Sequence, residues 1–255
     1  MKVTLLGTGT SVGVPMIGCP CKTCRSKDPC DKRLRTSALI EHSGKNILID
    51  TSTDFRQQML TAKVTHLEAV LYTHQHYDHI AGFDDLRAFQ FLRQKAPKCF
   101  ATSEAAAHIK HTFEYAFGNA IQSGGGLPEV EITEINERPF TLFGLEIIPI
   151  HIFHGLLPIL GFRIGKFAYL TDCSEIPELS FELLNGLDTL ILDGLRFKPH
   201  PTHLTIEDAI TQAERISPRI TYLTHMNHDV LHKEAEQSLP KNVRLGYDGL
   251  TFEIE

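Results

Sequence analysis

Residues 72–79, Tyr72-Thr73-His74-Gln75-His76-Tyr77-Asp78-His79, place three imidazoles and a carboxylate within six positions. They follow an apolar run at residues 68–72, which predicts a buried strand with the cluster at its end. If the strand continues to His74 and His76, these two side chains share a face, because residues two apart along an extended chain point the same way. Two imidazoles on one face can bind one metal ion. The Asp-His pair that ends the cluster is free to hold a second ion, so the spacing predicts two metals.

The alternative to metal binding is a structural role for these side chains. A single histidine beside a strand is usually a core or surface residue with a satisfied hydrogen bond. Three histidines and an aspartate within six residues contribute little to packing, and so many polar groups at a strand end are costly to bury. We therefore favour metal binding for residues 74–79.

The hexapeptide His74-Gln75-His76-Tyr77-Asp78-His79 resembles the HxHxDH motif of the metallo-β-lactamase superfamily, and the resemblance extends over nearly the whole chain. It implies an α/β (α+β) fold, the αβ/βα four-layer sandwich, with a dinuclear metal site between the two sheets. We expect residues 1–255 to form one hydrolase domain of this kind.

Composition and charge narrow the class of protein. The chain has 255 residues, of which 42% are hydrophobic, enough for a sizeable core. Its formal net charge of −6 argues against a nucleic-acid-binding protein, because phosphate neutralisation requires a basic face. The apolar run at residues 1–6 is far too short for a signal peptide, and no stretch approaches the roughly 18 apolar residues of a spanning helix. We expect a cytoplasmic protein without membrane contact.

The segment Gly18-Cys19-Pro20-Cys21-Lys22-Thr23-Cys24 has a CxCxxC pattern, and we expect a knuckle over about residues 18–30. In an intracellular protein of this size, a tight Cys cluster binds metal more often than it forms disulfides. Three thiolates within six residues can converge on one tetrahedral ion, and a remote histidine is the best fourth donor. Structural zinc is therefore favoured over unliganded thiols. Cys30 is a competing ligand that we expect to stay unpaired.

A glycine-rich segment, Gly7-Thr8-Gly9-Thr10-Ser11-Val12-Gly13-Val14-Pro15, follows the first predicted strand at residues 2–6. It lacks the Gly-Lys-Ser/Thr of a P-loop, so a tight turn that approaches the active site is favoured over a phosphate cradle. Another glycine-rich stretch, residues 123–128, predicts a loop that is either on the substrate side or a plain connection.

Helices are expected between the strands, and Thr205 and Asp208 predict a capping pair at the start of the last of them. The expected helices span residues 53–61, 83–94, 104–115 and 206–216.

Further candidate ligands stand at the ends of later predicted strands. His151 and His154 follow residues 145–150, and either could be a ligand. Asp172 and Asp193 each end an apolar run, so both are candidates for a carboxylate that bridges two ions. The resemblance favours His154 and Asp172, and Asp193 then supports the site nearby.

The Gly-Thr-Gly turn, the CxCxxC pattern and Thr-His-x-x-His at residues 224–228 together resemble the phosphoribosyl cyclic phosphodiesterase branch of the superfamily. This resemblance implies a bridging Asp172, a supporting Asp50 and a general acid, His203. It assigns His74, His76 and His154 to one active-site ion, and Asp78, His79 and His225 to the other. It assigns Cys19, Cys21, Cys24 and His228 to a structural Zn²⁺.

The implied ligands predict a hydrolase with two divalent ions, Mn²⁺ or Zn²⁺, and Asp78 and His203 as catalytic residues. Two cations lower the pKa of a bridging water and stabilise charge on the attacking and leaving atoms. We expect the bridging hydroxide to attack a small cyclic phosphodiester such as phosphoribosyl 1,2-cyclic phosphate, while His203 protonates the departing alkoxide. The resemblance also implies a homodimer.

Other functions share parts of these motifs. A tRNA 3′-processing nuclease has the HxHxDH cluster, but it needs a long RNA-clamping insertion or a basic arm, and neither is visible here. A thioester or lactam hydrolase stays open, because the metals activate water equally well, although such enzymes usually lack the Cys pattern. The pyrroloquinoline-quinone biosynthesis protein PqqB has a similar knuckle but lacks the intact metal cluster. A metal-stabilised binding module would need the second ion to be absent.

Overall fold

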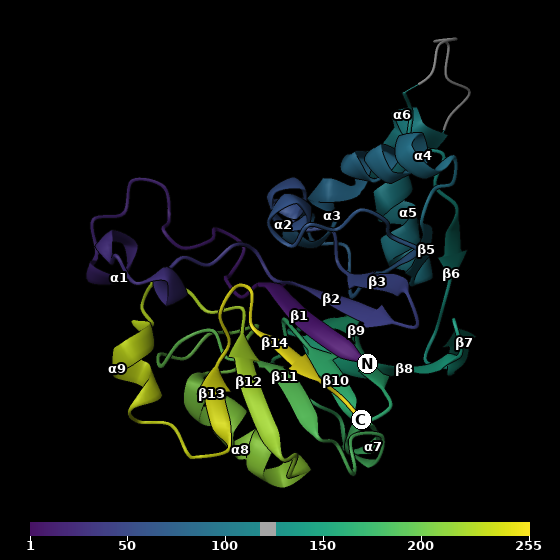
Figure 1. Ribbon diagram of the computed structural model, residues 1–255. Helices are drawn as coiled ribbons and strands as arrows, with labels where there is room; N and C mark the ends of the chain where they lie inside the picture. Colours follow the sequence, from purple (N-terminus) through teal and green to yellow (C-terminus); the bar gives the residue numbers. More distant parts are fainter. Residues whose placement is uncertain (118–125) are drawn as a thin grey trace.

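The computed structural model describes residues 1–117 and 126–255 (Figure 1). Residues 123–125 of the glycine-rich stretch, for which a loop is predicted, lie outside the described residues. In the described part of the chain, two seven-stranded sheets face each other, and helices cover their outer faces.

The described strands of the first half of the chain, β1 to β6, and the C-terminal strand β14 form the first sheet, and β7 to β13 form the second. The first sheet has the order β14 (Thr251–Glu253), β1 (Lys2–Gly7), β2 (Ser37–His42), β3 (Lys45–Ile49), β4 (Ala69–Leu71), β5 (Lys98–Ala101), β6 (Ile132–Glu134). The second has the order β13 (Val243–Leu245), β12 (Ile220–Thr224), β11 (Thr189–Asp193), β10 (Phe167–Leu170), β9 (Leu157–Ile164), β8 (Leu145–His154), β7 (Phe140–Leu142).

The helices form the two outer layers. Helices α2 to α6 lie over the first sheet, and α7 and α8 lie over the second (Figure 1). The helices are α1 (Lys22–Arg25), α2 (Phe55–Thr61), α3 (Tyr77–Ile80), α4 (Arg87–Arg93), α5 (Ser103–Thr112), α6 (Glu114–Phe117), α7 (Glu178–Glu182), α8 (Ile206–Ile216) and α9 (His232–Glu236), with 3₁₀ turns η1 (Pro29–Asp31) and η2 (Ala81–Leu86).

Central strands are buried on both faces. In β4, Ala69 and Leu71 pack between the sheets, whereas Val70 packs under the helices of the first sheet. Ile47 of β3 and Phe162 of β9 meet in the same layer between the sheets. Helices cover the outer faces, so these strands are continuous apolar runs rather than alternating ones. The predicted αβ/βα four-layer sandwich is confirmed.

The predicted helices and strands agree with the structure except at some boundaries. Strand β4 ends at Leu71 and does not reach His74 and His76. Beyond it the Thr73 N–H donates to the Asp50 carboxylate at 2.8 Å, which replaces the hydrogen bonding of a neighbouring strand. The helices predicted over residues 83–94 and 104–115 are each divided, the first into η2 and α4 and the second into α5 and α6. At the start of α8 the predicted capping pair is confirmed as a reciprocal capping box.

The parallel strands of both sheets end at the same edge of the sandwich. Strands β3, β4 and β5 run parallel in the first sheet, and β10, β11 and β12 run parallel in the second. The residues that follow parallel strands gather at their carboxyl ends, which is where ligands bind in sheets of this type. Of the helices in the described residues, none is long and apolar enough to cross a membrane.

At Gly7, the last residue of β1, the backbone passes very close to the backbone of Arg35. A Cβ at this position would lie 2.0 Å from the backbone oxygen of Arg35, which cannot rotate away. We expect Gly7→Ala to lower the free energy of unfolding by about 3 kcal/mol in urea titrations. Gly44→Ala is the control, because Gly44 has a φ of +69° but open space around it, and about 1 kcal/mol is expected. Equal losses would contradict the steric account.

Candidate metal centres and active site

The candidate site is built from residues that follow or end strands of both sheets. Asp50, Asp172 and His225 follow β3, β10 and β12, and all three adopt left-handed backbone conformations, with φ of 61°, 54° and 61°. This region is costly for residues other than glycine, and such strain concentrates at functional sites. All three side chains are buried, so the turns direct them into the space between the strand ends.

Two groups of candidate ligands share one carboxylate, that of Asp172. Within each group, one ligand atom from every residue lies within 4.8 Å of the others. The first group consists of His74, His76, His154 and Asp172, and the second of Asp78, His79, Asp172 and His225. The structure therefore brings together every residue expected at the dinuclear centre.

The spacing within these groups fits metal coordination better than direct hydrogen bonding. From the carboxylate of Asp172, the Nε2 atoms of His79, His225 and His74 lie 3.2, 3.3 and 3.9 Å away. These nitrogens are buried and have no hydrogen-bond partner within the described residues. Two ligands that are each about 2.1 Å from a tetrahedral ion lie about 3.4 Å apart. The unsatisfied nitrogens and the carboxylate are thus placed to hold divalent ions.

Asp50 orients the imidazoles of His74 and His79 through hydrogen bonds on the Nδ1 side of each ring. Its Oδ2 accepts the Nδ1–H of His79 at 2.7 Å and the hydroxyl of Thr73 at 2.8 Å. Since that hydroxyl donates to Asp50, its oxygen accepts the Nδ1–H of His74 at 2.9 Å. Both rings therefore hold Nδ1 in a hydrogen bond and point Nε2 at the centre.

The carboxylates and imidazoles of the two ligand groups shift one another's pKa values. Burial alone would raise the pKa of Asp172, but His225 and His79 hold it well below its usual range. Burial would lower the pKa of His79, yet Asp172, Asp78 and Asp50 raise it well above its usual range. The pKa of His74 is lowered by burial and by neighbouring His79. The carboxylates thus create a negative field that favours cations between the two groups.

His203 lies over the two groups without belonging to either. Its Nδ1 is 2.8 Å from Oδ2 of Asp193, and its ring stacks on His225 with centroids 4.7 Å apart. Burial and nearby His225 lower the pKa of His203 to about 3, and burial raises the pKa of Asp193 well above its usual range. Asp193, the rival for the bridging position, therefore contacts His203 and lies outside both groups.

The Cys knuckle forms a separate group with His228, and its ligand atoms also lie within 4.8 Å of one another. The Nδ1 of His228 lies 3.5 Å from the Sγ of Cys19 and 3.4 Å from that of Cys21. Although burial raises the pKa of Cys21, the backbone N–H of Cys24 and the ring of His228 lower it to about 6. Burial instead raises the pKa of Cys24 to about 11, so metal binding there would have to displace a proton. Three cysteines and one histidine within reach of one another are nevertheless the ligand set of a tetrahedral zinc site. Cys30 lies outside the group.

Sequence reasoning missed Arg33, which connects the two centres. This buried side chain donates from Nη1 to the carbonyl of Asn227 at 3.1 Å and from Nη2 to that of Val230 at 2.8 Å. The loop that it holds contains both His225 and His228. Arg33 also pairs with buried Asp31 at 3.4 Å, but both carbonyls that it holds lie almost 200 positions away, which no local pattern marks.

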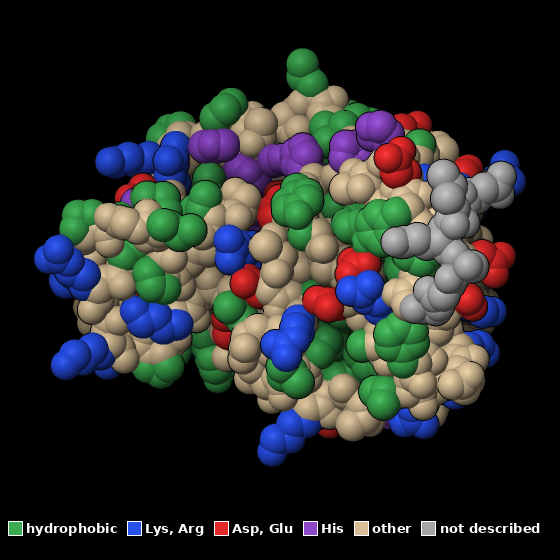
Figure 2. All heavy atoms as spheres, turned by 90° about the horizontal axis from the view of Figure 1, so that it is seen from above, with side chains coloured by type: hydrophobic (Ala, Val, Ile, Leu, Met, Phe, Trp, Pro, Cys, Tyr) green, Lys and Arg blue, Asp and Glu red, His purple; other side chains and the backbone are tan. Residues whose placement is uncertain are grey.

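Seen from above, histidine side chains gather in a band across one face of the molecule (Figure 2). His151 does not join either ligand group, and instead lines a cavity beside Gln75. The close approach of Glu137 to His151, with Oε1 and Nδ1 3.2 Å apart, was not expected from the sequence.

Comparison with known sequences identifies one matching family and one relative that is longer than this chain. The model of the beta-lactamase superfamily domain matches residues 45–226. An octanoyltransferase of Porphyromonas gingivalis is 43% identical over 259 residues, which cover 100% of this chain and 52% of that protein. The chain thus spans about half the length of this relative.

Among solved structures, a diphosphatase from the PhnP family is 42% identical, with a TM-score of 0.93 and coverage of 100% of this chain and 98% of that one. The Zn²⁺-bound PqqB from Methylobacterium extorquens is 20% identical, with a TM-score of 0.82 and complete coverage of both chains, a likeness that shows the fold alone.

If the Cys knuckle holds zinc, replacing one of its ligands should lower the zinc content of the protein. We expect Cys24→Ser to lose about one zinc per chain and to melt at least about 5 °C lower, because its thiolate is replaced by a weak ligand. Cys30→Ser is the matched control and should keep both metal content and melting temperature. Elemental analysis and calorimetry measure the two quantities. Unchanged zinc in Cys24→Ser would argue against the knuckle as a zinc site.

Proposed function

The chain belongs to the beta-lactamase superfamily, and we propose that it is a dinuclear phosphodiesterase acting on small cyclic phosphodiesters of the type of phosphoribosyl 1,2-cyclic phosphate. The observation that carries this proposal is the pair of ligand groups that share Asp172. The 42% identity to a PhnP-family diphosphatase supports a phosphate-containing substrate and a hydrolytic reaction. Two divalent ions, Mn²⁺ or Zn²⁺, would supply water activation and neutralise charge on the phosphoryl oxygens.

The chain's own contribution is to hold the ligands rigidly before substrate binds. Asp50 and Thr73 fix the rings of His74 and His79, and the Nδ1–H of His154 donates to the carbonyl of Thr202 at 2.7 Å. Each of these contacts leaves Nε2 for an ion. A preorganised cluster of this kind stabilises developing charge without reorganising during the reaction.

His203 is the proposed proton donor to the leaving oxygen. Asp193 accepts its Nδ1–H at 2.8 Å, so the second proton of an imidazolium is held at Nε2, on the opposite side of the ring. An anionic phosphate beside the ring favours its protonation. A proton placed on the leaving oxygen matters most when that oxygen would depart as an alkoxide.

A second candidate reaction is hydrolysis of a diphosphate. The PhnP-family relative is a diphosphatase, and a further cavity of about 480 Å³ lies beyond His203, lined also by His200 and Glu175. A phosphate leaving group needs no added proton near neutral pH. The two reactions would therefore differ in their dependence on His203.

The reaction class is tested with bis(p-nitrophenyl) phosphate, a ribose cyclic phosphate and a thioester, using manganese-loaded protein. We expect turnover of the phosphodiesters and none of the thioester. Asp78→Ala should lose at least about 100-fold in kcat/KM, because it removes a ligand of one ion. Thioester turnover alone would favour the thioester hydrolase, and a fully metallated but inactive protein would favour a binding module.

The role of His203 is tested by comparing leaving groups. We expect His203→Ala to reduce kcat on an alkyl cyclic phosphate by about 10² or more, and on bis(p-nitrophenyl) phosphate by less than about tenfold, because nitrophenolate departs without a proton. His108→Ala is the control, since His108 is exposed on α5 and lies outside the ligand groups. Equal losses on both substrates would exclude the proton-donor role, and an unaffected diphosphatase activity would favour the second candidate.

A further inference from the structure

His225 is held differently from the other buried imidazoles of the two ligand groups. In each of the others the Nδ1 atom makes a hydrogen bond, as it does in His74, His79 and His154. Both nitrogens of the buried His225 ring lack a hydrogen-bond partner in the part of the chain that the structure describes. The position of this ligand therefore depends on the backbone that carries it, immediately after β12.

Three buried side chains, Tyr169, Thr36 and Thr224, form a hydroxyl network that adjoins this ligand, since Thr224 directly precedes His225. The hydroxyl oxygen of Tyr169 lies 2.9 Å from Oγ1 of Thr36, which in turn lies 2.9 Å from Oγ1 of Thr224. None of the three residues is more than 1% exposed. A buried hydroxyl without a partner is costly, so the three groups fix one another's positions.

The hydroxyl network joins the two sheets. Thr36 directly precedes β2 of the first sheet, whereas the other two hydroxyls belong to β10 and β12 of the second. On the far side of His225, the N–H of Met226 donates to the carbonyl of Thr8 at 2.9 Å, just beyond β1. The residues on either side of His225 are thus held from the first sheet, although His225 itself follows a strand of the second.

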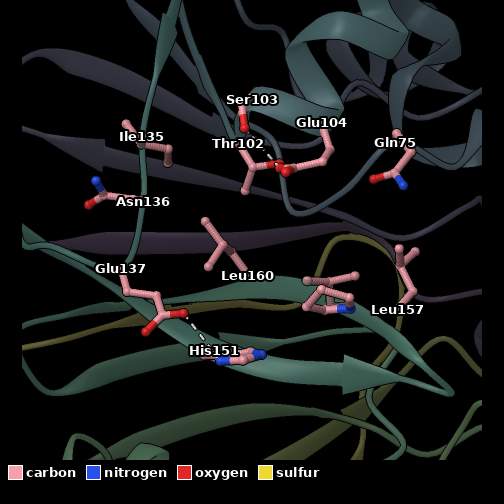
Figure 3. A pocket seen from close by; sticks show the side chains of 12 residues that line it. Gln75, Thr102, Ser103, Glu104, Ile135, Asn136, Glu137, His151, Leu157 and Leu160 are labelled. Atoms are coloured by element: carbon pink, nitrogen blue, oxygen red, sulfur yellow. Dashed lines mark hydrogen bonds and ion pairs between the residues drawn. The ribbon is translucent and has the colours of Figure 1, made fainter.

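The ligand loop of the other group is held by different contacts. The N–H of Leu160 in β9 donates to the carbonyl of Thr73 at 3.1 Å, directly before His74. Figure 3 shows Leu160 and Gln75, the residue after His74, at the cavity beside this loop. A change in the hydroxyl network should therefore act more strongly on the ion site that contains His225 than on the site that contains His74.

We propose that the hydroxyl network positions His225 and so sets the affinity of the ion site that contains Asp78 and His225. Its members are positioning residues, because they act through His225 and lie outside both ligand groups. Replacing an outer partner of a metal ligand typically weakens metal binding by about 10- to 100-fold. The inference rests on the two-ion centre of the proposed function, and its test measures ion binding rather than turnover.

The test is a calorimetric Mn²⁺ titration of protein that keeps the knuckle zinc but has been stripped of active-site ions. The wild type should show two binding steps, and Asp78→Ala identifies the step that belongs to the site of His225. Thr224→Val, which has a similar shape but no hydroxyl, should weaken that step at least about tenfold and the other step by less than about threefold. Thr224→Ser keeps the hydroxyl and should stay within about threefold of the wild type at both steps.

Two tyrosines of the second sheet provide a further matched comparison. Tyr169→Phe should weaken the same step as Thr224→Val, and it supplies the test if Thr224→Val does not fold. Tyr222→Phe should change neither step, because the ring of Tyr222 stacks on Phe252 and its hydroxyl lies outside the network.

Failure of this inference is distinguishable from failure of the proposed function. Two steps in the wild type that weaken equally in Thr224→Val, or that do not change, would overturn the inference and leave the two-ion centre standing. Equal losses in Thr224→Ser and Thr224→Val would also overturn it, because the hydroxyl would then be irrelevant. A single binding step in the wild type would overturn the two-ion centre together with the inference.

Discussion

The buried carboxylate of Asp172 is the constraint on which the site and much of the sandwich depend. An ionised carboxylate deep in a protein is costly unless positive charge or strong donors surround it. Here the surrounding groups come from both sheets, since His74 and His79 follow β4 of the first sheet and His225 follows β12 of the second. The charge balance therefore requires the two sheets to meet with their strand ends aligned.

Backbone geometry and buried hydrogen bonds maintain this alignment. Asp50, Asp172 and His225 turn into left-handed conformations at their strand ends, a cost that the apolar layers on either side offset. Arg33 holds the loop that contains His225, and the same loop presents His228 to the Cys knuckle. A zinc ion held by the knuckle would therefore stabilise the loop that also contains His225.

The features that depend on neighbouring residues were predictable from the sequence, whereas contacts between distant residues were not. HxHxDH, CxCxxC and the apolar runs that end in acidic or histidine residues depend on neighbouring positions, so the sandwich and both ligand groups were predictable. The hydrogen bonding of Thr73 to Asp50 ended β4 early, which an apolar run cannot reveal. Arg33 reaches the carbonyls of Asn227 and Val230 only through tertiary packing, and no sequence spacing marked it.

The central claim is that the two ligand groups around Asp172 each hold a divalent ion. Anomalous X-ray diffraction at the manganese and zinc edges, from crystals of the metal-loaded protein, tests it most directly. The account predicts two peaks flanking the Asp172 carboxylate and a third, zinc-specific peak among Cys19, Cys21, Cys24 and His228. A single peak or none beside Asp172, with His79 and His225 hydrogen-bonded to it instead, would contradict the dinuclear centre.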